Sequence, residues 1–288
     1  MTNSSVRYSA PLSAAEAREF TAFVHEMIGV AFGIIRPRFL TGTRVHSKAD
    51  ASPVTAADRG AERALSALVQ RRYPAHGVLG EEYGSKSGAG RYRWILDPID
   101  GTRAFISNCF LFGTLIALER DDGAGFKPVL GCIAHAAAGL ALIGHSRETR
   151  LYAADGSQRR ARVRPCGRIE DATLLATTHW STGEQSGGAA VEGLIQRARL
   201  YRTWGDCFGY FALATGGADI MLDPTLSYWD VAAIVPVIEG AGGQVSAWDG
   251  GDPLAAPSLI ATAGALHREI LAALASPGMK TQPAHTGN

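Results

Sequence analysis

The sequence predicts a mixed α/β or α+β protein in which helices and short buried strands form layers. Apolar residues recur at helical spacing in some segments and form short runs bounded by turn residues in others. The two kinds of segment alternate along the 288 residues, without an internal repeat of about 20–50 residues. Such alternation is typical of layered folds, in which each element buries one face against the next layer.

Two helices are predicted near the start of the chain. Ser13 and Glu16 have the spacing of a capping box, and apolar residues follow at helical spacing until Pro37 ends or kinks the helix. A second helix is predicted over residues 55–72. The stretch 46–54 between them is polar and contains a proline, so we expect a loop there.

The remaining segments predict alternating strands and helices. Residues 144–168 are polar and rich in arginine, which indicates a surface hairpin or a junction between two halves of the chain, and we expect 276–288 to be a flexible tail. The predicted strands are 78–80, 94–96, 112–118, 129–134, 140–143, 174–177, 219–222 and 258–262, and the predicted helices are 189–199, 206–216, 228–240 and 266–274.

The composition excludes several classes of protein. A formal net charge of +1 is too small for a dedicated nucleic-acid binder, and a hydrophobic fraction of 46% is too high for a disordered chain. No apolar run reaches the roughly 18 residues of a membrane span, and the N-terminus lacks the apolar core of a signal peptide. The four cysteines are scattered, as is usual in a reducing compartment. We therefore expect a cytoplasmic protein with no nucleic-acid or membrane partner.

Residues 97–102, with the sequence Asp-Pro-Ile-Asp-Gly-Thr, carry the strongest chemical signal. A predicted apolar strand stops at two carboxylates, Asp97 and Asp100, which a proline turn can bring to one point. Two converging carboxylates repel each other unless a cation lies between them, and oxygen ligands suit Mg²⁺. After Gly101 the chain can enter a helix, whose first amides would face an anion such as a phosphate. A capped turn without catalytic function is the alternative interpretation of these residues.

Two other acidic segments add to this signal. Glu81 and Glu82 directly follow the apolar strand 78–80, where a pair of carboxylates is unusual unless it faces a cation. Asp230 begins an apolar helix after Trp229. An interaction with the helix dipole would also explain Asp230.

The order of these motifs resembles the inositol monophosphatase superfamily, a group of Mg²⁺-dependent, lithium-sensitive phosphatases. The resemblance extends over about residues 12–275 and rests on residues 53–58, 80–82, 97–102 and 229–233. It implies the αβαβα layered sandwich of the sugar phosphatases and a homodimer. It also implies one domain over 1–288, with a metal and phosphate half at 12–145 and a half at 170–275 that holds the substrate pocket and Asp230.

The resemblance assigns a role to each acid. It implies that the site holds two or three Mg²⁺ ions. The first would be bound by Glu81, Asp97 and the carbonyl of Ile99, the second by Asp97, Asp100 and Asp230, and a weaker third with help from Asp58. Glu81 and Thr102 would orient and deprotonate a metal-activated water for in-line attack, and the amides of Gly101 and Thr102 would bind the phosphate.

The substrate prediction rests on a second resemblance. Residues 205–210, with the sequence Gly-Asp-Cys-Phe-Gly-Tyr, are similar to a segment of the histidinol-phosphatase branch. Asp223 falls where the family places an acid that contacts substrate, and with Asp206 it would suit a cationic leaving group. Asp206 could instead cap the following helix. Arg103 is a candidate for contact with substrate or a partner subunit, or an ordinary surface residue, and Asp219 is expected to face solvent or to end a strand.

The sequence thus predicts a phosphatase that acts on a small phosphorylated metabolite, L-histidinol phosphate in histidine biosynthesis. The alternatives are an inositol-1-monophosphatase or broader sugar phosphatase, and a non-enzymatic binding or regulatory protein with the same fold. The loop 183–188 either borders the pocket or has no role in it.

Overall fold

Two long helices near the start of the chain cover one face of a large sheet. The computed structural model describes residues 11–42, 45–47, 53–145, 147–179 and 188–275. Helix α1 (Ala14–Ile35) begins at the predicted capping box, in which Ser13 N donates to Glu16 Oε2 at 2.9 Å. It ends in the short helix η1 (Arg36–Arg38), which contains Pro37. Helix α2 (Ala56–Arg72) begins at a second capping box, formed by Thr55 and Asp58.

The large sheet has eight strands in the order β10-β9-β8-β7-β6-β5-β3-β4. Only the β3–β5 pair is parallel, and the other neighbouring strands are antiparallel. The strands are β3 (Gly77–Gly80), β4 (Gly84–Lys86), β5 (Tyr92–Asp100), β6 (Gly113–Asp121), β7 (Phe126–His135), β8 (Leu140–His145), β9 (Glu148–Ala153) and β10 (Gln158–Ala161).

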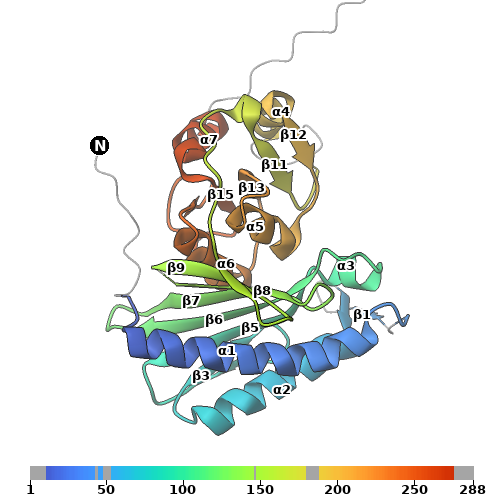
Figure 1. The fold of residues 1–288 in the computed structure, drawn as a ribbon, viewed down its shortest axis with the longest axis vertical. Coiled ribbons are helices and arrows are strands. Elements are labelled where there is room, and N and C mark those ends of the chain that lie inside the picture. The colour runs from blue at the N-terminus through green and yellow to red at the C-terminus, as the bar shows by residue number, and fades with distance from the viewer. Residues whose placement is uncertain (1–10, 43–44, 48–52, 146, 180–187, 276–288) are drawn as a thin grey trace, which may run out of the picture.

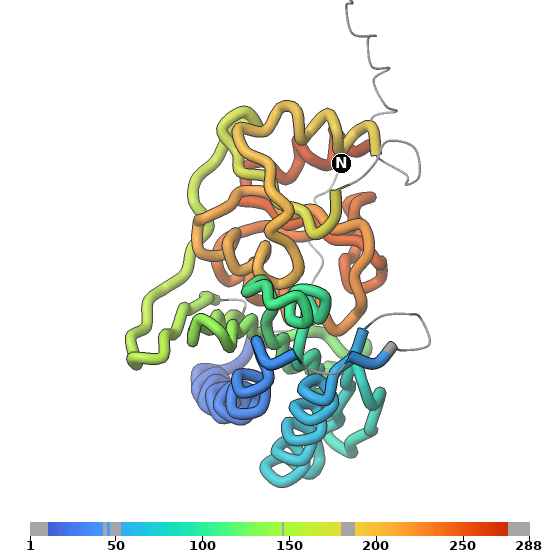
Figure 2. The backbone as a smooth tube through the Cα atoms, turned by 90° about the vertical axis from the view of Figure 1, so that its right-hand side faces the viewer, coloured from blue at the N-terminus to red at the C-terminus, as the bar shows by residue number. Residues whose placement is uncertain are grey.

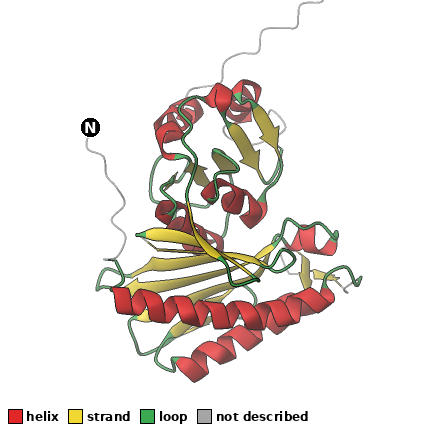
Figure 3. Cartoon of the chain, in the orientation of Figure 1, coloured by secondary structure: helices red, strands yellow, loops and turns green. Residues whose placement is uncertain are grey.

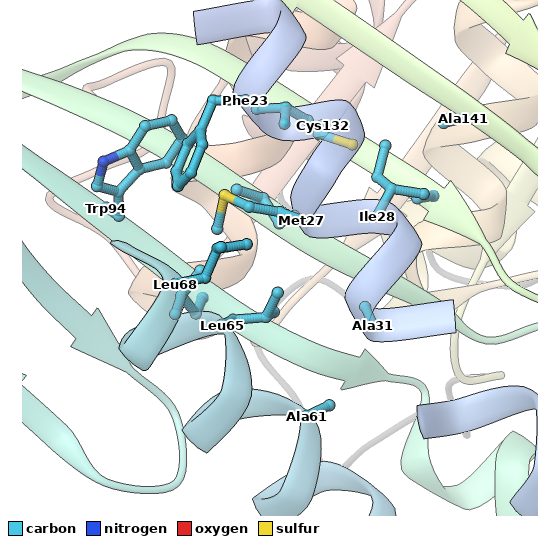
Figure 4. Close-up of a cluster of buried hydrophobic side chains, with 14 of the residues drawn as sticks. Phe23, Met27, Ile28, Ala31, Ala61, Leu65, Leu68, Trp94, Cys132 and Ala141 are labelled. Atoms are coloured by element: carbon cyan, nitrogen blue, oxygen red, sulfur yellow. The ribbon is translucent and has the colours of Figure 1, made fainter. Parts of the chain in front are cut away.

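Apolar side chains join α1 and α2 to this sheet. Phe23 and Met27 of α1 and Leu65 of α2 are buried in one cluster with the fully buried Trp94 of β5, and the ring centroid of Phe23 lies 5.1 Å from that of Trp94 (Figure 4). Side chains at alternate positions of the same strands, such as Ile95, point to the opposite face and belong to a second core. The sheet is therefore covered on both faces.

The second core holds a pair of helices between two sheets. Helices α5 (Asp206–Ala214) and α6 (Tyr228–Gly240) pack there, and beyond them lies a five-stranded sheet in the order β12-β11-β13-β15-β14. Its strands are β11 (Thr173–Ala176), β12 (Leu200–Arg202), β13 (Ile220–Asp223), β14 (Gln244–Ser246) and β15 (Leu259–Thr262). Helices α4 (Gly188–Arg197) and α7 (His267–Ala275) cover its outer face, with the short helices η2 (Ile169–Asp171) and η3 (Gly264–Leu266) before β11 and α7.

The layers thus run helix, sheet, helix, sheet, helix, as the predicted αβαβα sandwich requires (Figures 1 and 3). Figure 2 shows α1 and α2 at one end of the stack and α4 and α7 at the other. Within the described ranges, no helix is long and apolar enough to span a membrane.

Two local expectations differ from the structure, and a third, the hairpin, is confirmed. The ends of the expected loop 46–54 pair as β1 (Val45–Ser47) and β2 (Pro53–Thr55). The polar stretch 144–168 supplies the hairpin β9–β10, which confirms the first of its two interpretations, and the first sheet therefore extends to Ala161. Asp219 does not face solvent: it is fully buried, and its Oδ1 accepts a hydrogen bond from Arg164 Nε at 2.7 Å, because an ionised carboxylate inside the protein requires a charged partner.

Two predicted features fall outside the described residues. They are the tail 276–288 and nearly all of the loop 183–188, of which only Gly188 is described, as the first residue of α4.

Candidate functional site

The predicted acidic turn lies at the end of β5, where the strand bulges. Asp97 pairs with Leu115 of β6 and Asp100 with Gly113, so the β5 side holds one more residue than the β6 side. Pro98 has no N–H to donate to the ladder, but its carbonyl accepts a hydrogen bond from Thr114 Oγ1 at 2.8 Å. The bulge directs both carboxylates toward the space between the two sheets.

Helix α6 brings a third carboxylate to this point. Asp97, Asp100 and Asp230 each offer one oxygen, and these oxygens all lie within 4.8 Å of one another. Asp97 and Asp230 are buried, and Asp100 is half-buried. The residues of the expected second ligand set therefore lie together, although Asp230 is 133 residues from Asp97 in the sequence.

Each of these acids also accepts a hydrogen bond from a backbone amide. Asp97 Oδ1 accepts from Ile99 N at 3.0 Å, Asp100 Oδ2 from Cys207 N at 2.5 Å, and Asp230 Oδ2 from Ser227 N at 2.9 Å. Asp58 has the same arrangement, since its Oδ2 accepts from Thr55 N at 2.9 Å. These bonds hold the carboxylates in fixed orientations, and Asp58 and Asp230 also complete the capping boxes of their helices.

The electrostatics of the cluster favour a bound cation. Burial raises the pKa of Asp97 well above its ordinary value, and the negative charges of Glu81, Asp100 and Asp230 raise it further. Burial also raises the pKa of Asp100 to about 6 and that of Asp230 well above its usual range. A divalent cation would offset this repulsion, and an all-oxygen donor set fits a hard cation such as Mg²⁺.

Glu81 and Asp58 border this group. Glu81 follows β3, and its backbone N donates to Leu96 O at 3.1 Å, which fixes it beside the end of β5. Asp58 Oδ1 lies 3.4 Å from Thr102 Oγ1, whose hydroxyl also lies 3.0 Å from the carbonyl of Ile99. Thr102 thus links two expected metal-binding groups, the Asp58 carboxylate and the Ile99 carbonyl.

Sequence reasoning missed Glu62, which holds the Glu81 turn. This α2 carboxylate is 1% exposed, and it accepts hydrogen bonds from Glu82 N at 2.7 Å and Tyr83 N at 3.0 Å. It lies so close to Gly80 that a Cβ there would come within 1.9 Å of Glu62 Oε1. A signal was available, because Asp58 and Glu62 are four residues apart and lie on the buried face of one helix.

The expected phosphate-binding turn begins a short helix, α3 (Thr102–Ile106). Gly101 is its N-cap and has φ +78°, a left-handed conformation that favours glycine. An added Cβ would lie 2.9 Å from Leu111 O and 3.1 Å from Asp206 Oδ2. Gly101 therefore allows both the turn and the close approach of Asp206.

Asp206 does not cap its own helix. Gly205 is the N-cap of α5, and Asp206 follows it with φ +48°, a conformation uncommon outside glycine. Its backbone N donates to Thr177 Oγ1 at 2.9 Å, while Asp100 accepts from the next amide of the helix. Burial raises the pKa of the Asp206 carboxyl to about 7, the charge of Asp100 adds to this, and Arg103 opposes it.

Asp223 lies behind Asp206. It is 1% exposed, and its carboxylate accepts hydrogen bonds from Tyr210 OH at 2.7 Å and Thr177 N at 3.3 Å. Burial raises its pKa to about 7. Because Thr177 in turn holds the backbone of Asp206, Asp223 supports the position of Asp206. The side chain of Arg103 is exposed on α3.

The comparisons with known proteins agree with this geometry. The sequence profile of the inositol monophosphatase family matches residues 16–278. The chain is 35% identical over 242 residues to the chloroplastic bifunctional phosphatase IMPL2 of Arabidopsis thaliana, covering 83% of this chain and 67% of that protein. It is 34% identical to the histidinol-phosphatase of Chlorobaculum parvum, covering 80% and 86% of the two chains. A structure of an inositol monophosphatase from Zymomonas mobilis superposes with a TM-score of 0.76 at 34% identity, covering 91% and 99%.

Replacing Glu62 tests whether it positions Glu81. We expect Glu62→Ala to weaken divalent-cation binding by roughly 10–100-fold, as is usual when a group that orients a metal ligand is removed. Titration calorimetry measures the binding, and urea unfolding shows that the variant is folded. Glu26→Ala, which removes an exposed acid of α1, serves as the control. A folded Glu62→Ala protein that binds the cation as the wild type does would show that Glu62 has no such role.

Proposed function

Because the chain belongs to the inositol monophosphatase family, a family of metal-dependent phosphatases, we propose that it is a Mg²⁺-dependent phosphomonoesterase acting mainly on L-histidinol phosphate. The observation that carries the phosphatase proposal is the convergence of Asp97, Asp100 and Asp230 beside the Gly101 turn. A carboxylate cluster next to the N-terminus of a helix suits a phosphate ester bridged to cations.

The residues around the cluster have distinct proposed roles. Glu81, Asp97, Asp100, Asp230 and the Ile99 carbonyl would hold two Mg²⁺ ions, and Asp58 would help to hold a third. When bound, the ions supply positive charge that neutralises the phosphate oxygens and eases ionisation of water. Glu81 and Thr102 orient the attacking water in line with the scissile bond and accept its proton, and the amides of Gly101 and Thr102 bind the phosphate.

Asp206 supports the choice of substrate. Its carboxylate lies beside Gly101, next to where the phosphate would bind, so it can face the leaving group. A nearby ammonium or imidazolium ion would favour the ionised form of this carboxyl and pair with it, so the position favours a cationic leaving group over a neutral polyol. Asp223 contributes by holding Thr177 and through it Asp206, and the exposed Arg103 lies close enough to affect the charge of Asp206. The proposed role lies in histidine biosynthesis, in the cytoplasm.

The second candidate is an inositol-1-monophosphatase. Its support is the Zymomonas structure, which is as similar to this chain as the Chlorobaculum histidinol-phosphatase is, at 34% identity in both cases. The two candidates share the metal chemistry and differ only in the leaving group. We also propose that lithium inhibits this enzyme, as it does the phosphatases that the sequence resembles, since the same acids would form its cation sites.

An assay of phosphate release with Mg²⁺ tests the function. We expect kcat/KM for L-histidinol phosphate to exceed that for inositol 1-phosphate, fructose 1,6-bisphosphate and 3′-phosphoadenosine 5′-phosphate at least tenfold, or about 1.4 kcal/mol. Asp97→Asn should reduce activity by about 100-fold or more while circular dichroism shows it folded. A preference for inositol 1-phosphate would contradict the substrate proposal alone. Full activity of folded Asp97→Asn would contradict the phosphatase mechanism.

Replacing Asp206 tests its role in selectivity. We expect Asp206→Asn to lower the ratio of kcat/KM for L-histidinol phosphate to that for inositol 1-phosphate about tenfold, because the anionic partner of the leaving group is lost. Asp155→Asn, in the turn between β9 and β10, serves as the control and should leave the ratio unchanged. An unchanged ratio in Asp206→Asn would remove Asp206 from the selectivity argument.

A homodimer is proposed from exposed apolar side chains near the site. Phe110 is 61% exposed, Leu40 is 58% exposed, and both lie beside Phe39, whose ring centroid is 5.2 Å from that of Phe110. Light scattering should give twice the mass of one chain, and Phe110→Arg should shift the protein toward the monomer. The exposed Tyr83 is the control, since Tyr83→Arg should keep the mass of the wild type. A monomeric wild-type protein would contradict the proposal.

A further inference from the structure

A groove runs between the N-terminal half of α1 and the strands β8 and β9. Its volume is about 590 Å³, within the usual range of small-molecule sites. Its walls include Ala17 and Arg18 of α1, Ile143 and His145 of β8, and Tyr152 of β9. We call this feature the α1–β9 groove.

Arginines outnumber acids in the α1–β9 groove, although the chain as a whole is almost neutral. The described residues that line it include three arginines, Arg18, Arg147 and Arg150, and one acid, Glu148. Their formal charges sum to +2, whereas the whole chain carries +1. Among the described residues, Arg150 is the one groove arginine whose guanidinium meets neighbouring side chains: its Nη1 lies 3.4 Å from Glu148 Oε1, and its Nε donates to Gln158 Oε1 at 3.2 Å. The acid that lines the groove therefore offsets only part of the positive charge of its arginines.

Two of the arginines have unused donors. Within the described part of the chain, no acceptor or acid meets the guanidinium group of Arg18 or Arg147. Guanidinium groups bind phosphate through paired N–H donors in a planar fork. Two such groups on one groove offer a phosphate several charge-assisted hydrogen bonds.

The other wall residues indicate the rest of the ligand. His145 Nδ1 accepts a hydrogen bond from Arg147 N at 3.2 Å, so the neutral ring carries its proton on Nε2 and is a further donor. His25 meets Tyr152 edge-on, with ring centroids 4.4 Å apart, and these rings continue into an apolar wall that includes Leu12 and Ile143. Such a wall suits a flat organic group.

We propose that the α1–β9 groove binds a small phosphorylated molecule with a flat apolar part, a nucleotide in chemical class, at a site separate from the metal cluster. The strand register shows that the groove and the carboxylate cluster lie near opposite ends of the sheet. Asp100 pairs with Gly113 at one end of the sheet, whereas His145 pairs with Leu130, near the end where Tyr92 pairs with Arg120. In Figure 1 the start of α1 likewise lies at the opposite end of the sheet from α3.

Titration calorimetry in EDTA with uridine 5′-monophosphate tests the groove, since chelation prevents metal-assisted binding at the carboxylate cluster. The full chain should bind the nucleotide, and the double variant Arg18→Gln/Arg147→Gln should bind it at least tenfold more weakly. Both arginines are exposed, so this variant is expected to fold, which its thermal unfolding checks. The matched control is Arg159→Gln/Arg268→Gln, which removes two exposed arginines that lie outside the groove and should leave the affinity unchanged.

Two further titrations test which part of the nucleotide and which site of the protein are involved. Uridine should bind at least tenfold more weakly than its monophosphate, because it lacks the group that the arginines hold. Asp97→Asn should bind the nucleotide as the wild type does. The proposal is overturned if the wild type does not bind, if the groove variant binds equally well, if uridine binds as tightly, or if Asp97→Asn abolishes binding.

Discussion

The structure depends on holding several like charges together in a water-poor space. Two charged carboxylates 4.8 Å apart repel by about 3 kcal/mol even at an effective dielectric constant near 20. The chain offsets part of this cost with backbone amides, one for each of Asp58, Asp97, Asp100 and Asp230. Those bonds restrict each carboxylate to one orientation, so the donors for a cation are arranged before it binds.

The need to hold these carboxylates together also explains how the layers are joined. The acids come from α2, β5 and α6, which belong to three different layers, so the site exists only while the layers keep their spacing. Helix α6 approaches the sheet closely at Gly131 of β7, where a Cβ would lie 2.1 Å from Ala233 O. Asp100 adds a direct link, because it accepts the amide of Cys207 at the start of α5. The acids proposed to bind the cations therefore also take part in the contacts that join the layers.

Local patterns predicted the long elements well. The helix α6 was expected at the residues where it occurs, α1 begins at the capping box that its sequence indicates, and α2 begins one residue after its expected start, because periodicity and capping act over a few residues. The strands β4, β12 and β14 were not expected, since each has three residues and depends on its partner for its conformation. The ends of the loop 46–54 formed strands for the same reason.

The sequence by itself determined the acidic turn at 97–102 and the position of Asp230 at the start of an apolar helix, because these features depend on near neighbours in the chain. Tertiary structure alone decided that Asp100 caps α5, 107 residues away, that Glu62 holds the Glu81 turn, and that Asp219 pairs with Arg164. It also decided that Asp223 is buried behind Asp206. These contacts join residues far apart in sequence, and whether a polar group meets a partner or water there depends on how the layers pack.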